Sequence, residues 1–200
     1  MTRIAIVGAG SVGTALGTGF ARTGHDVAYA VRNPDDTKYA TLPHRAPLAD
    51  ATRNADVVVL AVPADAVPGT IPMLSLAPGQ VVIDATNAVR TAVPGGHATM
   101  GELVAALVPD GVAVAKAFNT VGAEHLGNGE TPTGRVFLPI AGDDAAVDLV
   151  LQLATDLGFE AVSLGGRDRF EMLEAHAKLW IHLAFGRGWG RQFAFTVIRP

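Results

Sequence analysis

The sequence predicts a doubly wound, mostly parallel α/β sheet with helices on both of its faces. Three observations point to this fold class. Short apolar, β-branched runs recur along the chain, helix-like segments alternate with them, and turn residues separate the two. Strands that are apolar on both faces suit a parallel sheet covered on each side. The βαβα order then places the loops that follow the strands around one crevice.

Each element is expected where such a run or segment is bounded by turn residues. The predicted strands are Ile4–Val7, Val27–Val31, Val57–Val62, Val81–Ile83, Val112–Ala117, Val136–Ile140 and, less distinctly, Glu160–Leu164. The predicted helices are Val12–Thr23, a stretch around Val67–Leu76, Gly101–Leu107 and Asp144–Leu157, the last with an N-cap region at Asp143–Asp144.

The pattern changes after residue 165. The segment "DRFEMLEAHAKLWIHLAF" predicts one helix, which ends at the glycines of "GRGWG" and is followed by the apolar tail "FAFTVI". Too few residues remain for a second domain. We therefore expect a dinucleotide-binding domain over residues 1–165, and a C-terminal helix and tail over residues 166–200 that pack on it as a short cap.

Composition narrows the function classes. The chain has 200 residues, of which 49% are hydrophobic and 17% charged, so an ordered globular protein is expected. A net charge of −4 gives no electrostatic footprint for nucleic acid. The absence of cysteine excludes thiolate catalysis, disulfides and Cys-based metal sites. No apolar run has the length of a signal sequence or a membrane span, so a soluble cytoplasmic protein is expected.

A glycine motif follows the first predicted strand. It consists of Gly8, Ala9, Gly10, Ser11, Val12 and Gly13, which match G-x-G-x-x-G. A strand directly before, a helix directly after and a second strand within about thirty residues make this a dinucleotide-binding signature. The three glycines permit the tight turn, the approach of the pyrophosphate and close helix packing, and the helix N–H groups meet the negative charge. The alternative is a glycine turn that serves packing alone.

Arginine stands where the second strand ends. Related domains often carry an acid there that accepts hydrogen bonds from the adenine ribose, but this chain has Arg32 and Asn33. A planar guanidinium suits the oxygens of a 2′-phosphate, and Lys38 adds charge if it lies close. The sequence therefore favours NADP(H) over NAD(H). The alternative is a solvated arginine in a loop.

The ends of later strands supply the rest of the crevice. These candidate cofactor-binding residues are Ala61, Val62, Pro63, Asn87 and Asn119. Three of them, Ala61, Val62 and Pro63, are apolar and can flank a ribose or the adenine. The two asparagines, with Thr86 and Thr120, can bond the nicotinamide carboxamide or can equally cap the following turns. Lys116 interrupts an apolar strand, so it is expected to pair with an acid such as Asp84, to extend its ammonium to solvent, or to serve the site.

No catalytic or metal-binding residue is predicted. His176 and His182 are six positions apart, which is not the i, i+4 spacing of two ligands on a helix. His182 lies between apolar residues and is expected in the core, whereas His125 would reach the crevice only if its loop folds over it. The sequence shows no carboxylate pair and no Ser/His/Asp set.

Several segments together resemble the NADPH-dependent coenzyme F420 reductase family of NADP oxidoreductases. They are "IAIVGAGSVGTALG", "GHDVAYAVRNP", "VVIDATNAV", "AKAFNTVGAEHL", "IAGDD" and "LWIHLAF". The resemblance implies a Rossmann domain with a small C-terminal addition, NADPH on the glycine loop and Arg32, and a deazaflavin against the nicotinamide. This sequence departs from the pattern of the family at "GAGSVG", where archaeal members tend to have a loop with Thr and Asn.

Two features that the chain lacks also favour a hydride acceptor with flat rings. It has no room for a second helical domain and no evident general acid, whereas hydride exchange between two rings requires mainly their apposition and the exclusion of water. Phe118, Trp180 and Trp189 could line such a pocket. The expected partner is a small-molecule hydride acceptor, coenzyme F420 or another flavin, with a possible homodimer through the C-terminal helix. The alternatives are an NADPH-dependent flavin, ferric or imine reductase, and a non-catalytic NADP(H) sensor.

Overall fold

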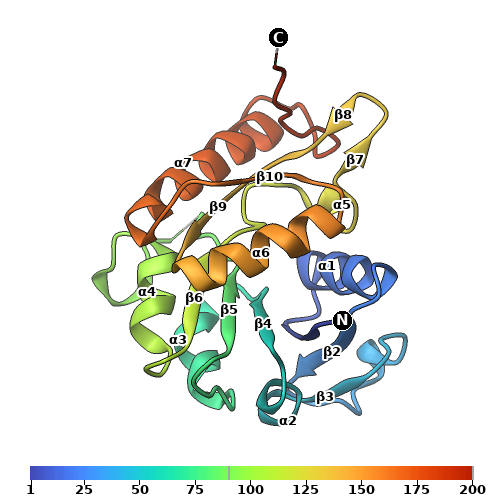
Figure 1. Cartoon of the computed structure of the whole chain (residues 1–200), viewed down its shortest axis with the longest axis vertical. Helices are drawn as coiled ribbons and strands as arrows, with labels where there is room; N and C mark the ends of the chain where they lie inside the picture. Colours follow the sequence, from blue (N-terminus) through green and yellow to red (C-terminus); the bar gives the residue numbers. More distant parts are fainter. Residues whose placement is uncertain (90, 200) are drawn as a thin grey trace.

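The computed structural model describes residues 1–89 and 91–199, which build a mostly parallel eight-stranded sheet and a two-stranded hairpin (Figure 1). The order across the large sheet is β10-β9-β6-β5-β4-β1-β2-β3. The strands are β1 (Arg3–Val7), β2 (Asp26–Val31), β3 (Arg45–Pro47), β4 (Val57–Leu60), β5 (Val81–Asp84), β6 (Ala113–Lys116), β7 (Glu130–Thr131), β8 (Gly134–Arg135), β9 (Phe137–Gly142) and β10 (Glu160–Ser163).

Helices and short helical turns connect these strands. The α-helices are α1 (Ser11–Arg22), α2 (Leu48–Arg53), α3 (Val67–Thr70), α4 (Met100–Leu107), α5 (Ala123–Leu126), α6 (Asp144–Asp156) and α7 (Phe170–Ile181). The 3₁₀ turns are η1 (Thr37–Tyr39), η2 (Ala64–Ala66), η3 (Ile71–Met73), η4 (Pro94–Gly96) and η5 (Arg167–Arg169), and a π-helical turn, η6 (His182–Gly186), follows α7. Within the described residues, no helix has the length and apolarity needed to cross a membrane.

Alternate residues of each central strand enter opposite cores. In β1, Ile4 and Ile6 pack with side chains of α1 and α6, whereas Ala5 and Val7 pack with those of α2, α4 and α7. Successive side chains of a strand point to opposite faces, so apolar runs without a polar face require helices on both sides of the sheet. The prediction of a doubly wound, mostly parallel sheet is confirmed.

The alternation of parallel strands ends after β6. β9 lies beside β6 but runs antiparallel to it, with Lys116 opposite Ala141, and β10 is parallel to β9. A parallel neighbour needs a crossover, usually a long helix, but the chain between β6 and β9 forms only the four-residue α5 and the β7–β8 hairpin. The expectation of βαβα order throughout is wrong at this point.

Three local predictions also need correction. β3 and α2 were not predicted, and the helix expected around Val67–Leu76 is divided into α3 and η3, where Pro72 has no N–H to extend the α-helical ladder. Asp143 is the N-cap residue of α6, as predicted, but its side chain makes no capping hydrogen bond. Its carboxylate instead accepts hydrogen bonds from Val114 N at 2.8 Å and from Arg167 Nε at 2.7 Å.

The C-terminal helix α7 packs on the same face of the sheet as α4, next to β9, and the tail returns toward the hairpin (Figure 1). Trp180 Nε1 donates to Phe193 O at 3.0 Å, and Phe137 N donates to Phe195 O at 2.8 Å. The tail is therefore tied both to α7 and to the start of β9.

Candidate functional site

The glycine loop lies where β1 turns into α1. Gly8 has φ +104°, and a Cβ there would lie 2.5 Å from Ala61 O. A Cβ on Gly13 would overlap Gly8 O. Only glycine fits both positions, because the first is in the left-handed region and the second is crowded by backbone. Ala61, at the end of β4, therefore forms part of the wall against the loop.

Gly10 faces open space, in contrast to its two neighbours in the motif. A Cβ built on Gly10 meets no atom within 4 Å, and no side chain caps the start of α1. The first intrahelical bond runs from Thr14 N to Gly10 O at 2.9 Å. The N–H groups of Ser11, Val12 and Gly13 thus stand at the positive end of a twelve-residue helix, which suits a pyrophosphate.

A cavity of about 240 Å³ lies beside this loop at the end of β2. Arg32 lines it, is exposed, and forms no hydrogen bond or ion pair with another described residue. Lys38 Nζ lies 2.9 Å from Asp36 Oδ2, and its hydrogen bond to this carboxylate raises the pKa of Lys38. The cavity is lined by Val7, Gly8, Ala30, Val31, Arg32, Asn33, Lys38, Tyr39, Leu48, Val62 and Thr70. Two cations and an amide thus meet at one site.

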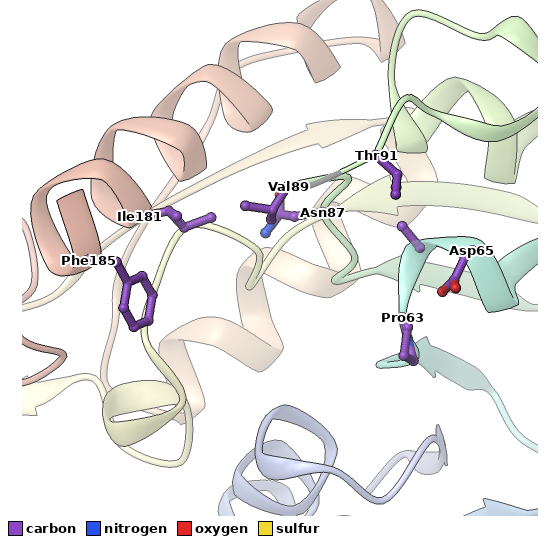
Figure 2. Close-up of a pocket in the computed structure, with 8 residues that line it drawn as sticks. Pro63, Asp65, Asn87, Val89, Thr91, Ile181 and Phe185 are labelled. Atoms are coloured by element: carbon purple, nitrogen blue, oxygen red, sulfur yellow. The ribbon is translucent and has the colours of Figure 1, made fainter.

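A second cavity, of about 680 Å³, lies between the loops after β4 and β5 and the end of α7 (Figure 2). It is lined by Pro63, Ala64, Asp65, Asn87, Val89, Thr91, Ile181 and Phe185. Most of these side chains are apolar, and Asp65 carries the charge among them. An apolar cavity with few polar groups is typical of small-molecule sites.

Asn87 is held in place by Asn119. Asn87 Nδ2 donates to Asn119 O at 2.7 Å, and Asn119 Nδ2 donates to Asn87 Oδ1 at 3.0 Å. Asn119 is only 6% exposed and is not among the residues that line the cavity, whereas Asn87 is. Thr86 N and Thr86 Oγ1 both donate to Asp84 Oδ1, at 2.9 Å and 2.6 Å, so the side chain that caps this turn is that of Asp84. That either asparagine contacts the nicotinamide stays a prediction.

The aromatic wall of the larger cavity was predicted from the wrong residues. Phe118 is buried, with its ring 6.0 Å from those of Phe20 and Phe159, and Trp180 stacks on Phe193 at 5.3 Å. Trp189 is exposed and does not line the cavity. Phe185 and Ile181 line it instead. Their i, i+4 spacing at the end of the predicted helix was the available signal, and a helical reading would have placed them on one face.

Neither histidine singled out from the sequence lies at this cavity. His125 lines a separate cavity near the β7–β8 hairpin, and its Nε2 is buried without a partner among the described residues. His182 begins η6 and is exposed, so its expected place in the core is wrong. Phe185 of the same turn lines the cavity.

Comparisons with known proteins show which family and fold this chain resembles. A sequence profile described as NADP oxidoreductase, coenzyme F420-dependent, matches residues 3–88, which include the glycine loop, Arg32 and Asn87. A protein of Arthrobacter sp. FB24, provisionally described as an F420-dependent NADP reductase, is 25% identical with a TM-score of 0.85 over 100% of both chains. A hypothetical protein of Sinorhizobium meliloti is 35% identical and has a TM-score of 0.70, covering 83% of this chain and 86% of that one. Residues 3–88 belong to the family of coenzyme F420-dependent NADP oxidoreductases.

The fold of this family member extends to more distant proteins. A reductive aminase of Aspergillus terreus, determined with NADPH4, is 17% identical with a TM-score of 0.69, and the match covers 94% of this chain but 63% of the aminase. At that identity the likeness concerns the fold alone. Membership of the family identifies the protein as an NADP-dependent oxidoreductase.

Proposed function

We propose that this protein transfers a hydride between NADP(H) and a flavin-like ring acceptor, most directly coenzyme F420. Two features of its own chain support NADP(H) as the cofactor. The N–H groups at the start of α1 are open to a pyrophosphate, and Arg32 pairs with no other described residue at the place where a 2′-phosphate is expected. Lys38 and Asn33 line the same cavity and supply further donors.

The observation that carries the choice of acceptor is the 680 Å³ cavity. Its walls come from the loops after β4 and β5 and from Phe185, and its lining is mainly apolar. Ligands of open α/β sheets bind at the carboxyl ends of the strands, where this cavity lies. Its volume is within the usual range for small-molecule sites, roughly 300–1,000 Å³.

The proposed division of work among the residues follows from these positions. NADP(H), when bound, supplies or accepts the hydride. The α1 N-terminus and Arg32 fix the two ends of the phosphate-bearing half of the molecule. Asn87, oriented by Asn119, offers an amide at the cavity, and Ile181 and Phe185 exclude water from it. No proton-transfer residue is required for exchange between two rings.

Steady-state reduction of alternative acceptors tests the proposal. We expect loss of the visible absorbance of oxidised F420 when NADPH and the protein are present. FMN, FAD, ferric chelates and a cyclic imine are compared at the same NADPH concentration. Preference for FMN or iron would replace F420 by another acceptor. Tight binding of NADPH without turnover of any acceptor would instead support a non-catalytic NADP(H) sensor.

Imine reduction is a second candidate because of Asp65. This carboxyl lines the cavity next to Pro63 and forms no hydrogen bond or ion pair with another described residue (Figure 2). A carboxyl at that place could stabilise an iminium or protonate the amine product. If this function is the right one, Asp65→Asn abolishes imine turnover, whereas F420 reduction is expected to persist in the same variant.

We propose in addition that α7 contributes to a homodimer. Met172 and Leu179 lie seven positions apart on this helix and are 55% and 50% exposed. Two turns of a helix separate such residues, so they share one face. Size-exclusion chromatography with light scattering tests this proposal. A monomeric mass for the unaltered protein, or an unchanged dimer in Leu179→Glu, would contradict it.

A further inference from the structure

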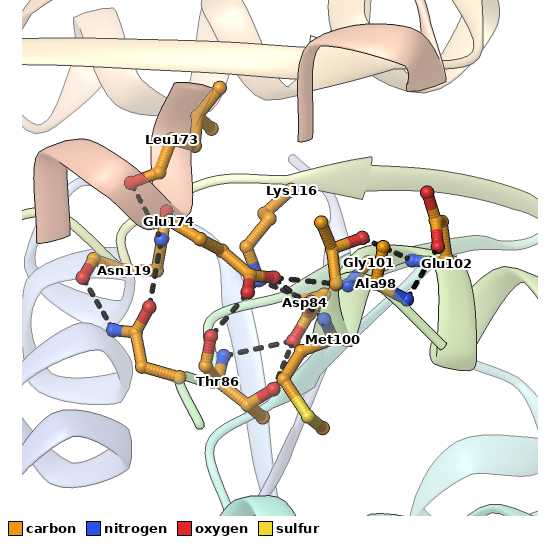
Figure 3. A network of polar contacts seen from close by, with 12 residues as sticks. Asp84, Thr86, Ala98, Met100, Gly101, Glu102, Lys116, Asn119, Leu173 and Glu174 are labelled. Atoms are coloured by element: carbon orange, nitrogen blue, oxygen red, sulfur yellow. Dashed lines mark hydrogen bonds and ion pairs between the residues drawn. The ribbon is translucent and has the colours of Figure 1, made fainter. Parts of the chain in front are cut away.

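A fully buried ionic cluster joins α7 to the ends of β5 and β6. Lys116 and Asp84 have no exposed surface, and Glu174 of α7 is 5% exposed. Lys116 Nζ lies 2.6 Å from Asp84 Oδ2, 3.0 Å from Glu174 Oε1 and 3.0 Å from Thr86 O (Figure 3). An ammonium has three protons, and each has an oxygen within reach. The cluster includes the pairing with Asp84 that the sequence suggested, and adds Glu174.

The second carboxylate of the cluster is compensated by backbone donors. Glu174 Oε1 accepts hydrogen bonds from Met100 N at 2.7 Å and from Gly101 N at 3.3 Å, both in the first turn of α4. The N-terminus of a helix is its positive end, so a carboxylate is favoured there. Glu174 therefore contacts a cation and a helix terminus at once, although it belongs to a third element.

This cluster fixes one wall of the 680 Å³ cavity relative to the other. On one side, Thr86 leads directly to Asn87, which lines the cavity. On the other side, Glu174 lies on the helix that carries Ile181 and Phe185 to the cavity. A helix is stiff over such a length, so a shift at Glu174 is passed on to its C-terminal end.

A second contact supports the same attachment. Asn119 Nδ2, which also holds Asn87, lies 3.4 Å from Leu173 O, one residue before Glu174. In addition, the ring of Phe170 at the start of α7 lies so close to Gly101 that a Cβ there would be 2.5 Å from it. The loops that follow β5 and β6, the start of α4 and the first half of α7 thus meet at one place.

We infer that Glu174 is a positioning residue for hydride transfer, which holds α7, and with it Ile181 and Phe185, at a fixed distance from the loop that carries Asn87. The inference rests on the proposed function, because that function places the acceptor in this cavity. Replacing a whole buried ion cluster by apolar groups of similar volume often costs no stability, whereas removal of one partner alone is destabilising. We therefore assign to the cluster the role of setting the geometry of the cavity, rather than that of stabilising the fold.

The test compares four substitutions on a background with one tryptophan. Trp189→Phe leaves Trp180, on α7, as the only reporter of that helix. Glu174→Ala removes the contact, Glu174→Asp shortens it by one methylene, and Glu174→Gln keeps an oxygen near Lys116 and Met100 N. Glu171→Gln, on an exposed position of the same helix, is the matched control.

We expect Glu174→Ala to shift the emission of Trp180 to longer wavelength and to lower kcat with F420 or FMN by on the order of tenfold or more, the cost of a misplaced ring. The Kd for NADPH is expected to stay unchanged, since the glycine loop and Arg32 lie on other elements. Glu174→Asp should give a smaller loss of the same kind. Glu174→Gln should keep the emission of Trp180 and the kcat close to those of the protein with Glu174. Glu171→Gln should change neither the emission nor the kcat.

Several results would overturn the inference. One is an unchanged emission and kcat in both Glu174→Ala and Glu174→Asp. Another is a rise in the Kd for NADPH that matches the fall in kcat, which would indicate a general structural role. If Glu174→Ala does not fold, Glu174→Asp and Glu174→Gln decide the matter. If the unaltered protein reduces neither F420 nor FMN, the proposed function fails, while the emission of Trp180 still shows whether Glu174 positions α7.

Discussion

At the scale of single residues, the proposed cofactor site depends on one charged side chain, that of Arg32, and on the absence of a side chain at Gly10. Arg32 is exposed in a cavity with Lys38, but Lys38 is already paired with Asp36, so Arg32 is the cation left for a ligand among the described residues of that cavity. Gly10 is the position of the motif at which a side chain would meet no protein atom. We therefore expect Arg32 and Gly10 to contribute to ligand binding more than to the stability of the fold.

Arg32→Ala should weaken the binding of NADPH by about 1.5–3 kcal/mol, the contribution of a hydrogen bond to a charged group, and should leave NADH binding nearly unchanged. Titration of both cofactors into both proteins measures the difference. Arg135→Ala, at an exposed arginine of β8, is the matched control and should bind both cofactors normally. Equal losses for the two cofactors in Arg32→Ala would mean that this arginine does not contact the 2′-phosphate.

Gly10→Val should abolish binding of NADPH and NADH alike while the melting temperature stays unchanged, because the new side chain enters only the path of the pyrophosphate. Gly8→Ala is the contrasting variant. It should lower the melting temperature, since its Cβ would lie 2.5 Å from Ala61 O at a positive φ. Normal NADPH binding by Gly10→Val would show that the loop does not face the phosphates.

At the scale of elements, α7 and the tail are joined by aromatic contacts around His176. The imidazole lies 5.8 Å from the ring of Phe137 and 4.9 Å from that of Phe195. Burial among these rings lowers the pKa of His176 from its usual value. The neutral imidazole is thus the form that the folded protein accommodates.

This lowered pKa predicts a loss of stability in acid. Below the ordinary histidine pKa of about 6.5, the unfolded chain binds a proton that the folded chain does not, so the free energy of unfolding decreases as the pH falls. His176→Phe removes this contribution. Thermal unfolding between pH 8 and pH 5 should therefore show a smaller decline for the variant than for the unaltered protein. Parallel declines would indicate that His176 titrates normally in the folded state.

At the scale of the whole molecule, the C-terminal tail forms ion pairs and an aromatic contact with earlier parts of the chain. Arg191 Nε lies 2.7 Å from Glu124 Oε1, and Arg199 Nη1 lies 2.6 Å from Glu160 Oε1. Phe193 covers Trp180. The glycine loop and Arg32 lie in other elements of the chain. The division of the chain near residue 165 into a cofactor domain and a cap stays a prediction.

Deletion of the chain from Gly186 onward should therefore abolish acceptor reduction more than NADPH binding. The deletion uncovers Trp180 and removes the contacts of the tail with η6, which carries Phe185, so some loss of thermal stability is also expected. NADPH titration, acceptor turnover and a melting curve on the same preparation separate these effects. Equal loss of binding and turnover would mean that the tail maintains the fold as a whole.

The features that the sequence determined by itself are those encoded within short segments. The fold class follows from apolar runs separated by turns, and the glycine loop follows from the spacing of Gly8, Gly10 and Gly13 between a strand and a helix. The place of Arg32 is equally local, because it directly follows a strand that pairs with β1. Each of these signals requires only a few neighbouring residues.

Only the tertiary structure decided how distant segments meet. The direction of β9, the reciprocal bonds between Asn87 and Asn119, and the place of Phe185 at the cavity all depend on contacts between residues far apart in the chain. The contact of Glu174 with Met100 N joins residues 74 positions apart. Such pairs leave no periodic pattern, since each partner alone is compatible with many environments, and the packing of helices on the sheet selects one of them.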